Sequence, residues 1–244
     1  MELNLEQILV QVGNTPIGRS RRRTADASFR SACTLPLMVL LVIASPSRSA
    51  ARVRPGIEFG LNYSSFNYYH RDVVPASYWD PGWRPSFTGG ATLEVPIRGR
   101  FDLVTGVRYV QQGNRVKFDD GQGTLNGEFR IYANYISMPA LLTYYPTAKR
   151  RFFASLGPEI GLLVSAYSVL EYTVPPLAAG YTNDKQSLER TNVMIDGSAG
   201  YEFPVENHAG VVSLRYARGL TGIAKNWLTD WDTRGVEMLV GMRW

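Results

Sequence analysis

From Arg54 to Trp244 the chain alternates apolar and polar residues within short segments of roughly ten residues, a length suited to a membrane strand. In the first segment, Ile57, Phe59 and Leu61 fall on one face, and the intervening residues, which are polar or glycine, fall on the other. The pattern recurs in seven further segments: Phe87–Val95, Phe101–Tyr109, Tyr135–Tyr144, Ser155–Ser165, Val193–Glu202, Val212–Ala217 and Gly235–Trp244. The alternation is least regular in Tyr135–Tyr144. A period of two residues is typical of a strand with two unlike faces, so the sequence predicts eight strands.

The connectors between these segments have two sizes, and short and long connectors alternate along the chain. The short ones are Arg98–Arg100, Pro146–Arg150 and Pro204–Ala209, and the long ones are Asn67–Arg84, Gly113–Phe129, Val169–Arg190 and Gly222–Thr233. Bacterial outer-membrane barrels have short periplasmic turns and long outer loops, and about 9–11 residues let a tilted strand cross the bilayer. We therefore predict an all-β fold, an eight-stranded antiparallel up-and-down transmembrane β-barrel, with both ends of the mature chain in the periplasm.

The polar faces carry small residues, charges of both signs and almost no lysine. Their charged residues are Glu58, Glu94, Asp102, Arg108, Glu159, Asp196, Glu202, Arg215, Glu237 and Arg243. The interior of an eight-stranded barrel is only wide enough for side chains. If these faces point inward, the charges must pair with one another, because an unpaired buried charge costs several kcal/mol. We therefore expect an internal ion-pair and hydrogen-bond network and no open pore.

The apolar faces would then meet lipid. Aromatic residues near the segment ends suit the girdles that such barrels place at the two membrane interfaces. They are Tyr63, Tyr109, Tyr144, Tyr201, Tyr216 and Trp244. The alternative is a soluble, lipocalin-like barrel, in which the apolar faces point inward and the polar faces meet water. The two hypotheses assign opposite directions to the same side chains.

Residues 1–51 are predicted to be a leader, and residues 52–244 an outer-membrane β-barrel domain. Basic residues at Arg19–Arg23 precede an uncharged apolar run, Leu35–Ala44, which small residues follow. This order is that of a cleaved N-terminal secretory signal peptide, and the run is too short to span a bilayer. A short buried helix and a lipoprotein signal are the alternatives, although Cys33 precedes the apolar run instead of following it. We expect an exported protein of the bacterial cell outer membrane.

Composition changes this picture little. The 244 residues include 26 Lys and Arg against 21 Asp and Glu, a formal charge of +5, but much of the excess lies in the leader. The net charge therefore gives no reason to expect a nucleic-acid partner. The single cysteine, Cys33, is also in the leader, so the body of the chain offers no disulfide and no thiolate metal site.

Candidate chemistry is sparse. The two histidines, His70 and His208, fall at opposite ends of the predicted barrel, where they cannot share a metal ion or a catalytic dyad. Ser64 and Ser65 are near His70 in sequence, but chance explains that proximity better than a Ser–His pair. Ion pairing explains the inward carboxylates, and the glycine-rich stretches lack the lysine of a phosphate loop. We assign no catalytic, cofactor-binding or metal-ligating residue and expect no enzyme.

The first predicted outer loop is rich in aromatic residues, at Tyr68–His70 and Tyr78–Trp83. Exposed aromatic residues mark contacts with ligands or partners, and they also anchor proteins at the lipid interface. Both interpretations stay open for this loop.

Four stretches carry a resemblance to a known family: Tyr135–Pro139, Leu156–Gly161, Asp196–Glu202 and Arg215–Leu220. In that order they look like the PorT-like outer-membrane β-barrel family of the Bacteroidetes, and the resemblance covers nearly all of the mature chain. The ending, an aromatic Trp244 preceded by apolar residues at alternate positions, is similar to the C-terminal signal read by the barrel-assembly machinery. The resemblance implies an integral outer-membrane barrel that meets outer-membrane lipids and that machinery. It implies no settled activity and no catalytic residues.

Three functions are compatible with these observations. The first is a non-catalytic barrel that supports the envelope or binds through its outer loops. The second is an accessory component of a protein secretion or transport complex, with the proteins of that complex as partners. The third, which the scattered histidines make the weakest, is a lipid-modifying outer-membrane enzyme.

Overall fold

The computed structural model describes residues 53–68, 80–119, 126–174, 180–183, 188–223 and 231–244. Eight long strands form the fold: β1 Arg54–Tyr68, β3 Arg84–Arg98, β4 Phe101–Asp119, β5 Asn126–Tyr144, β6 Phe152–Val174, β8 Thr191–Val205, β9 His208–Gly219 and β10 Trp231–Arg243. Two short strands are added to them, β2 Asp80–Gly82 beside β4 and β7 Gly180–Asn183 beside β6. The predicted leader, His70 and the tip of the aromatic first loop lie outside the described residues.

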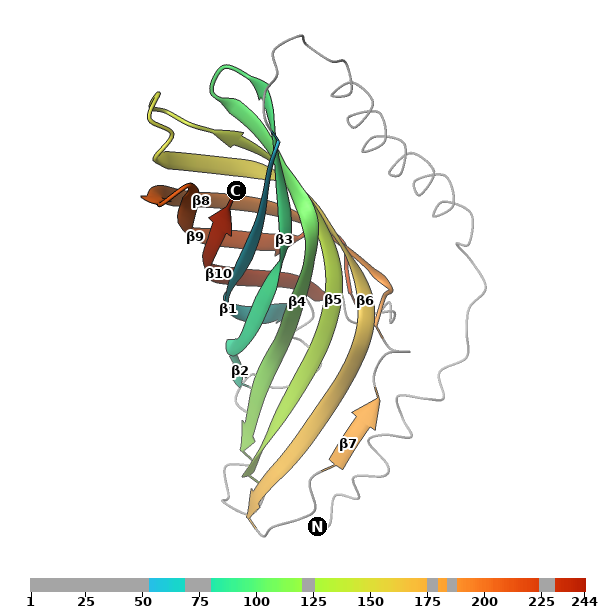
Figure 1. Ribbon diagram of the computed structural model, residues 1–244. Helices are drawn as coiled ribbons and strands as arrows, with labels where there is room; N and C mark the ends of the chain where they lie inside the picture. The colour runs from blue at the N-terminus through green and yellow to red at the C-terminus, as the bar shows by residue number, and fades with distance from the viewer. Residues whose placement is uncertain (1–52, 69–79, 120–125, 175–179, 184–187, 224–230) are drawn as a thin grey trace, which may run out of the picture. The chain divides into compact units, whose positions relative to one another are not determined.

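The long strands close into a ring (Figure 1). Each pairs with its neighbour in an antiparallel sense, and β1 pairs with β10 from Gly56–Arg243 to Tyr68–Trp231. The predicted fold, a closed eight-stranded antiparallel up-and-down barrel, is confirmed. No helix among the described residues is long and apolar enough to cross a membrane.

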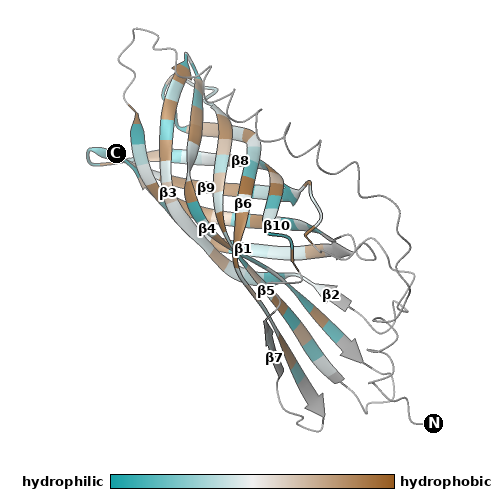
Figure 2. Cartoon of the chain, turned by 90° about the vertical axis from the view of Figure 1, so that its right-hand side faces the viewer, coloured by the Kyte–Doolittle hydropathy of each residue, from teal (hydrophilic) through white to brown (hydrophobic). Residues whose placement is uncertain are grey.

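The two faces point in the directions that the transmembrane hypothesis requires. Outward, Leu61, Phe59 and Met238 are 69%, 56% and 64% exposed. Inward, Arg108 and Glu237 are 1% and 3% exposed. Figure 2 shows the resulting alternation of hydrophobic and hydrophilic residues along the strands. The soluble, lipocalin-like alternative requires the opposite arrangement and is wrong.

Three strands are much longer than the sequence pattern predicts. β4, β5 and β6 have 19, 19 and 23 residues, about twice the number that crossing the bilayer needs. Much of the predicted connectors Gly113–Phe129 and Val169–Arg190 is therefore strand, and Lys117 lies within β4. The reason is physical: beyond the lipid a strand keeps its backbone hydrogen bonds while its outward side chains turn polar, so the hydropathy alternation ends before the strand does.

Close strand packing depends on a glycine at one position in β4. Gly106 has a φ of 157°, and a Cβ atom there would lie 2.1 Å from the Ala91 carbonyl oxygen of β3. Any other residue at Gly106 would force β3 and β4 apart at this point.

Outward charges and aromatic rings mark the limits of the lipid-facing belt. Between the two ends of the strands the outward positions are uncharged, as on β1 from Pro55 to Tyr63. Paired rings lie near both limits: Phe101–Tyr144 and Phe152–Tyr201 at the short turns, and Tyr63–Trp83 and Phe87–Tyr109 at the opposite end. The predicted girdles are thus present as stacked or tilted pairs of rings.

Replacing an outward residue of the belt by arginine should destabilise the barrel according to its depth. Leu214 on β9 is 55% exposed within the belt, and Leu220 is 63% exposed just beyond the outer end of β9. Leu214→Arg should lower the free energy of unfolding by about 2–4 kcal/mol, and Leu220→Arg by about 1 kcal/mol or less. Urea unfolding in lipid vesicles, followed by tryptophan fluorescence, measures both values. Equal effects of the two substitutions would contradict the placement of the belt.

Candidate functional site: the barrel interior and its two mouths

The middle of the interior is organised around one arginine of β4. Arg108 is fully buried, and its guanidinium contacts Glu58 of β1 at 3.1 Å, Glu159 of β6 at 2.9 Å and Glu237 of β10. It also donates a hydrogen bond to the Thr88 hydroxyl of β3 at 3.0 Å. A single side chain thereby ties together five strands across the lumen.

A second arginine shares the same carboxylates. Arg215 of β9 lies 3.2 Å from Glu58, 3.7 Å from Glu159 and 4.0 Å from Asp196. Two guanidinium groups thus face four carboxyl groups in this middle layer, counting Glu237; Glu58 is partly buried and the other three are buried. Because each charge has lost its hydration, the layer is stable only while every guanidinium keeps its partners.

A second charged layer lies toward the short turns, an end that faces the periplasm in bacterial outer-membrane barrels. Arg243 contacts Glu94 at 2.6 Å and Glu202, and Arg54 contacts the same two carboxylates. Arg150, in the turn between β5 and β6, contacts the buried Asp102. Three cations therefore face three carboxylates, and this layer is electrically neutral.

Tyr145 joins the members of the short-turn layer. This residue directly follows β5 and is completely buried. Burial raises the pKa of its phenol, so the hydroxyl stays protonated and can donate one hydrogen bond. It donates to Glu202 at 2.6 Å and accepts from Arg243 at 2.9 Å. The hydroxyl thus connects a carboxylate and a guanidinium that also contact each other.

The outer part of the interior is neutral. Amide and hydroxyl side chains bridge the strands there: Asn192 of β8 donates hydrogen bonds to Gln112 of β4 at 3.3 Å and to Thr233 of β10 at 3.1 Å. Beyond them lies a buried apolar cluster: Phe66, Ile131, Ala133, Tyr135, Leu163, Ala166, Leu188 and Ile223. Charged, neutral and apolar side chains thus occupy the described interior from one end to the other.

The sequence located most of this network. All ten predicted inward charges lie in it, which confirms the expected ion pairing. Sequence reasoning missed Arg54, Tyr145 and Arg150, because they lie at or beyond segment ends, where alternation gives no direction. An arginine or tyrosine directly beside a strand end, next to inward carboxylates, is the signal that could have found them.

Of the candidates for chemistry, the structure describes Ser64, Ser65 and His208, while His70 lies outside the described residues. Ser64 is buried on β1, where its hydroxyl accepts a hydrogen bond from the Gly113 backbone N–H at 3.0 Å. His208 lies at the short-turn mouth, where its ring meets Trp244 edge-on at 6.2 Å. Among the described residues, no group of three or more His, Cys, Asp or Glu side chains is arranged to hold a metal ion.

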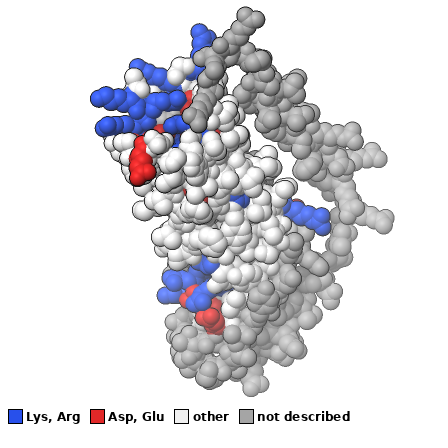
Figure 3. Space-filling view, in the orientation of Figure 1, with Lys and Arg blue, Asp and Glu red and all other residues white. Residues whose placement is uncertain are grey.

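The outer mouth is bordered by the extensions of β4, β5 and β6, residues 111–119, 126–134 and 165–174, which we call the outer wall. On its outward face Arg130 contacts Glu128 at 2.6 Å and Glu171 at 3.2 Å. Tyr132 stacks on Tyr167 with ring centroids 4.4 Å apart. Figure 3 shows charged residues gathered toward both ends of the barrel and few between them. The outer wall therefore stands outside the hydrocarbon.

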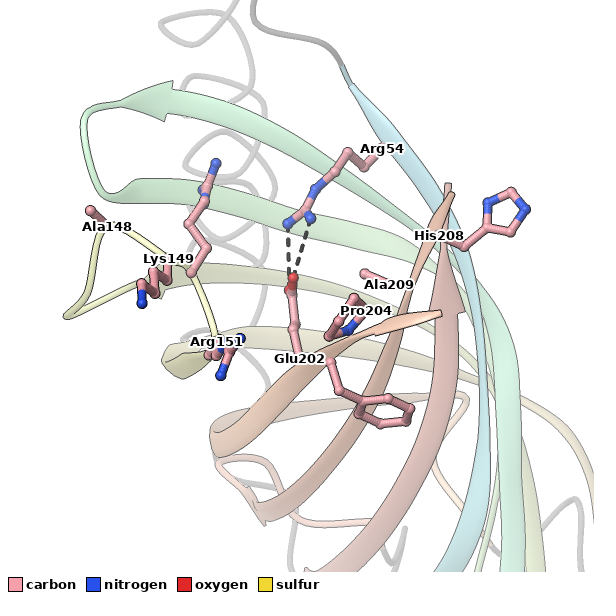
Figure 4. A pocket seen from close by; sticks show the side chains of 10 residues that line it. Arg54, Ala148, Lys149, Arg151, Glu202, Pro204, His208 and Ala209 are labelled. Atoms are coloured by element: carbon pink, nitrogen blue, oxygen red, sulfur yellow. Dashed lines mark hydrogen bonds and ion pairs between the residues drawn. The ribbon is translucent and has the colours of Figure 1, made fainter. Parts of the chain in front are cut away.

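The short-turn mouth contains a pocket of about 530 Å³ (Figure 4). It is lined by Arg54, Ala148, Lys149, Arg150, Arg151, Glu202, Phe203, Pro204, His208 and Ala209. Four of these residues are cations and one is a carboxylate. The pocket lining therefore has an excess of cations, in contrast to the neutral layer beneath it.

A protein-family model described as an outer membrane protein beta-barrel domain matches residues 34–225. No curated protein matches the sequence. Among solved structures, the chain is similar to OprG of Pseudomonas aeruginosa, with 13% identity over 79% of this chain and 96% of that chain and a TM-score of 0.43. It is also similar to Ail of Yersinia pestis, the attachment invasion locus protein, with 14% identity, coverages of 79% and 99% and a TM-score of 0.36.

A third similar structure is the outer membrane protease OmpT of Escherichia coli, with 8% identity over 83% of this chain and 99% of that chain and a TM-score of 0.40. These similarities are too remote to carry an argument about function. The chemistry of this chain has to be inferred from its own residues.

Removing the guanidinium of Arg108 should strongly destabilise the folded barrel. Arg108→Met leaves Glu58, Glu159 and Glu237 facing one another without their shared cation, and should lower the free energy of unfolding by about 3–5 kcal/mol. Arg130→Met, which removes a part-exposed arginine of the outer wall, should cost about 1 kcal/mol or less. Urea unfolding in vesicles compares the two. Similar losses would mean that the interior pairs are no more important than surface ones.

The Tyr145 hydroxyl should be important for stability although it forms no ion pair itself. Tyr145→Phe removes hydrogen bonds to charged partners and should lower the free energy of unfolding by about 1.5–3 kcal/mol. Tyr144→Phe, one residue away and facing outward, is the matched control and should change it by about 0.5 kcal/mol or less. The midpoint of heat-induced mobility change on gels gives an independent measure. A larger effect at Tyr144 would contradict the assignment.

Proposed function

Because the chain belongs to the outer membrane protein beta-barrel domain family, we propose that it acts in the outer membrane as a non-catalytic barrel that binds partners at its outer end. The observation that carries this proposal is the filled interior. Arg108 and Tyr135 are among its largest fully buried side chains, and they lie in the charged layer and the apolar cluster respectively. With its lumen occupied by its own side chains, the barrel offers its ends, and not a channel, to other molecules.

The outer wall supports binding at the outer end. Its outward face combines fixed charges with stacked rings, and the guanidinium of Arg84 lies 3.6 Å above the Tyr132 ring. Side chains that hold one another in this way lose little conformational freedom when a partner docks. Lys117 and Glu171 remain exposed on the same face. Rigid aromatic and arginine side chains with exposed charges around them are typical of protein recognition surfaces.

We infer further that the chain belongs near the PorT-like barrels, and the interior supports that inference. The stretches that carry the resemblance meet in the middle layer, where Arg215 lies 3.7 Å from Glu159 and 4.0 Å from Asp196. The resemblance therefore reflects how the interior is packed. An accessory role in a secretion or transport complex is the second candidate function, and it would require a partner at one of the two mouths.

Site-specific crosslinking in native membranes tests the proposal. A photoreactive amino acid at Lys117 or Glu171, on the outer wall, should yield adducts with an envelope macromolecule, because both side chains face away from the barrel above the lipid belt. The same group at Arg98, an exposed residue at the short-turn end, is the matched control. Gel shifts followed by mass spectrometry identify the adducts.

The outcomes separate the candidate functions. Adducts from Lys117 and Glu171 alone support binding at the outer end. Adducts from Arg98 alone would contradict binding at the outer end and would support an accessory role on the periplasmic side. The absence of adducts at all three positions would overturn the binding proposal.

A further inference from the structure

The cations of the short-turn mouth fall into two groups. Arg54, Arg150 and Arg243 contact the three carboxylates of the short-turn layer, so their charges are compensated within the protein. Lys149 and Arg151 line the pocket above that layer and are exposed. Neither has a carboxylate within 4.0 Å among the described residues. The pocket therefore carries positive charge in excess of what the protein neutralises.

The backbone of the turn separates these two groups. Arg150 has a φ of 52°, in the left-handed region, and its backbone N–H donates a hydrogen bond to the Thr147 carbonyl at 3.0 Å. Its guanidinium reaches Asp102 and lies 4.3 Å from the centre of the Tyr145 ring. The side chains on either side of Arg150, those of Lys149 and Arg151, stay outside the short-turn layer. A strained backbone position thus holds two uncompensated cations beside one pocket.

The opposite side of the pocket is mostly apolar. Phe203, Pro204 and Ala209 line it together with His208. The Nδ1 atom of His208 is buried and has no hydrogen-bond partner among the described residues. In Figure 4 Lys149 and Arg151 lie on one side of Glu202 and His208 on the other, and the dashed lines show Glu202 already bonded to Arg54. The one lining carboxylate is therefore committed to the protein itself.

We propose that this mouth pocket binds a phosphate-bearing anion. A guanidinium fork and an ammonium group are the side chains that proteins use for phosphate, and here they stand together without internal counter-charges. A volume of about 530 Å³ accommodates a small organic phosphate or a phospholipid headgroup, since small-molecule sites measure about 300–1,000 Å³. Phe203 and Trp244, exposed outward at the same end, place the pocket at the level of the membrane interface, where lipid phosphates lie.

Binding should be measured on the barrel purified from outer membranes in dodecyl maltoside, a detergent without phosphate. One arm titrates sn-glycerol 3-phosphate by calorimetry. The other arm transfers the barrel to nanodiscs of phosphatidylcholine with or without phosphatidylglycerol, and counts the lipids retained by native mass spectrometry. Saturable binding in the first arm assigns the site to a soluble phosphate, and preferential retention of phosphatidylglycerol in the second assigns it to a lipid headgroup. Either result supports the site.

Two variants make the test specific. Lys149→Gln/Arg151→Gln should weaken binding by about tenfold or more, because both charge-assisted contacts are lost. Arg98→Gln removes a positive charge from the same end of the barrel but outside the pocket lining, and should weaken binding about twofold or less. Heat-modifiability on gels verifies that each variant is folded. Equal weakening by the two variants, or no binding in either arm, would overturn the proposal.

Discussion

Within hydrocarbon every backbone N–H and C=O group must find its partner in the protein, and this constraint determines the architecture of the barrel. The pairing of β1 with β10 removes the last free edge, so each long strand has a neighbour on both sides. Closure with eight strands also fixes a narrow interior, and strand geometry sends every second side chain into it. Once the ring is closed, the inward polar groups are shielded from water. They must therefore form their hydrogen bonds and ion pairs with one another.

The interior shows how that requirement is met. Arg108 serves three carboxylates from three other strands, and Tyr145 bridges charges in the layer nearest the short turns. Each shared group makes the position of one strand depend on several others, so the network also fixes the register of the ring. The same side chains occupy the described part of the lumen. Accessible charged groups remain at the outer wall and at the short-turn mouth, and the two binding proposals rest on those surfaces.

The sequence predicted what the alternation of residues encodes. Phe59 and Arg108 point outward and inward as their positions in the pattern require, and the ten inward charges lie inside the barrel. The lengths of β4, β5 and β6 were not predictable in the same way. The alternation of apolar and polar residues is present only where a strand faces lipid, and these strands continue beyond that level. Beyond the lipid, contacts between strands depend on residues that are distant in sequence, such as Tyr132 of β5, which stacks on Tyr167 of β6.

The short-turn mouth was missed for a related reason. Arg54 and Arg150 lie at or beyond the ends of the predicted segments, and nothing in their local sequence shows that their side chains point inward. Their direction is decided by carboxylates far away in the chain, Glu94 and Asp102. The pocket combines residues from three separate parts of the chain, so only the folded ring brings its cations together.

The choice of ion pairs for the interior has a further physical reason. An apolar interior of equal volume can be as stable as a buried ion-pair network. With apolar residues on both faces, however, each strand would become a continuous hydrophobic run, and such runs aggregate before they fold. Placing Glu58, Arg108 and Glu237 on the inward faces keeps each strand half polar until closure, and the ring then brings their opposite charges together.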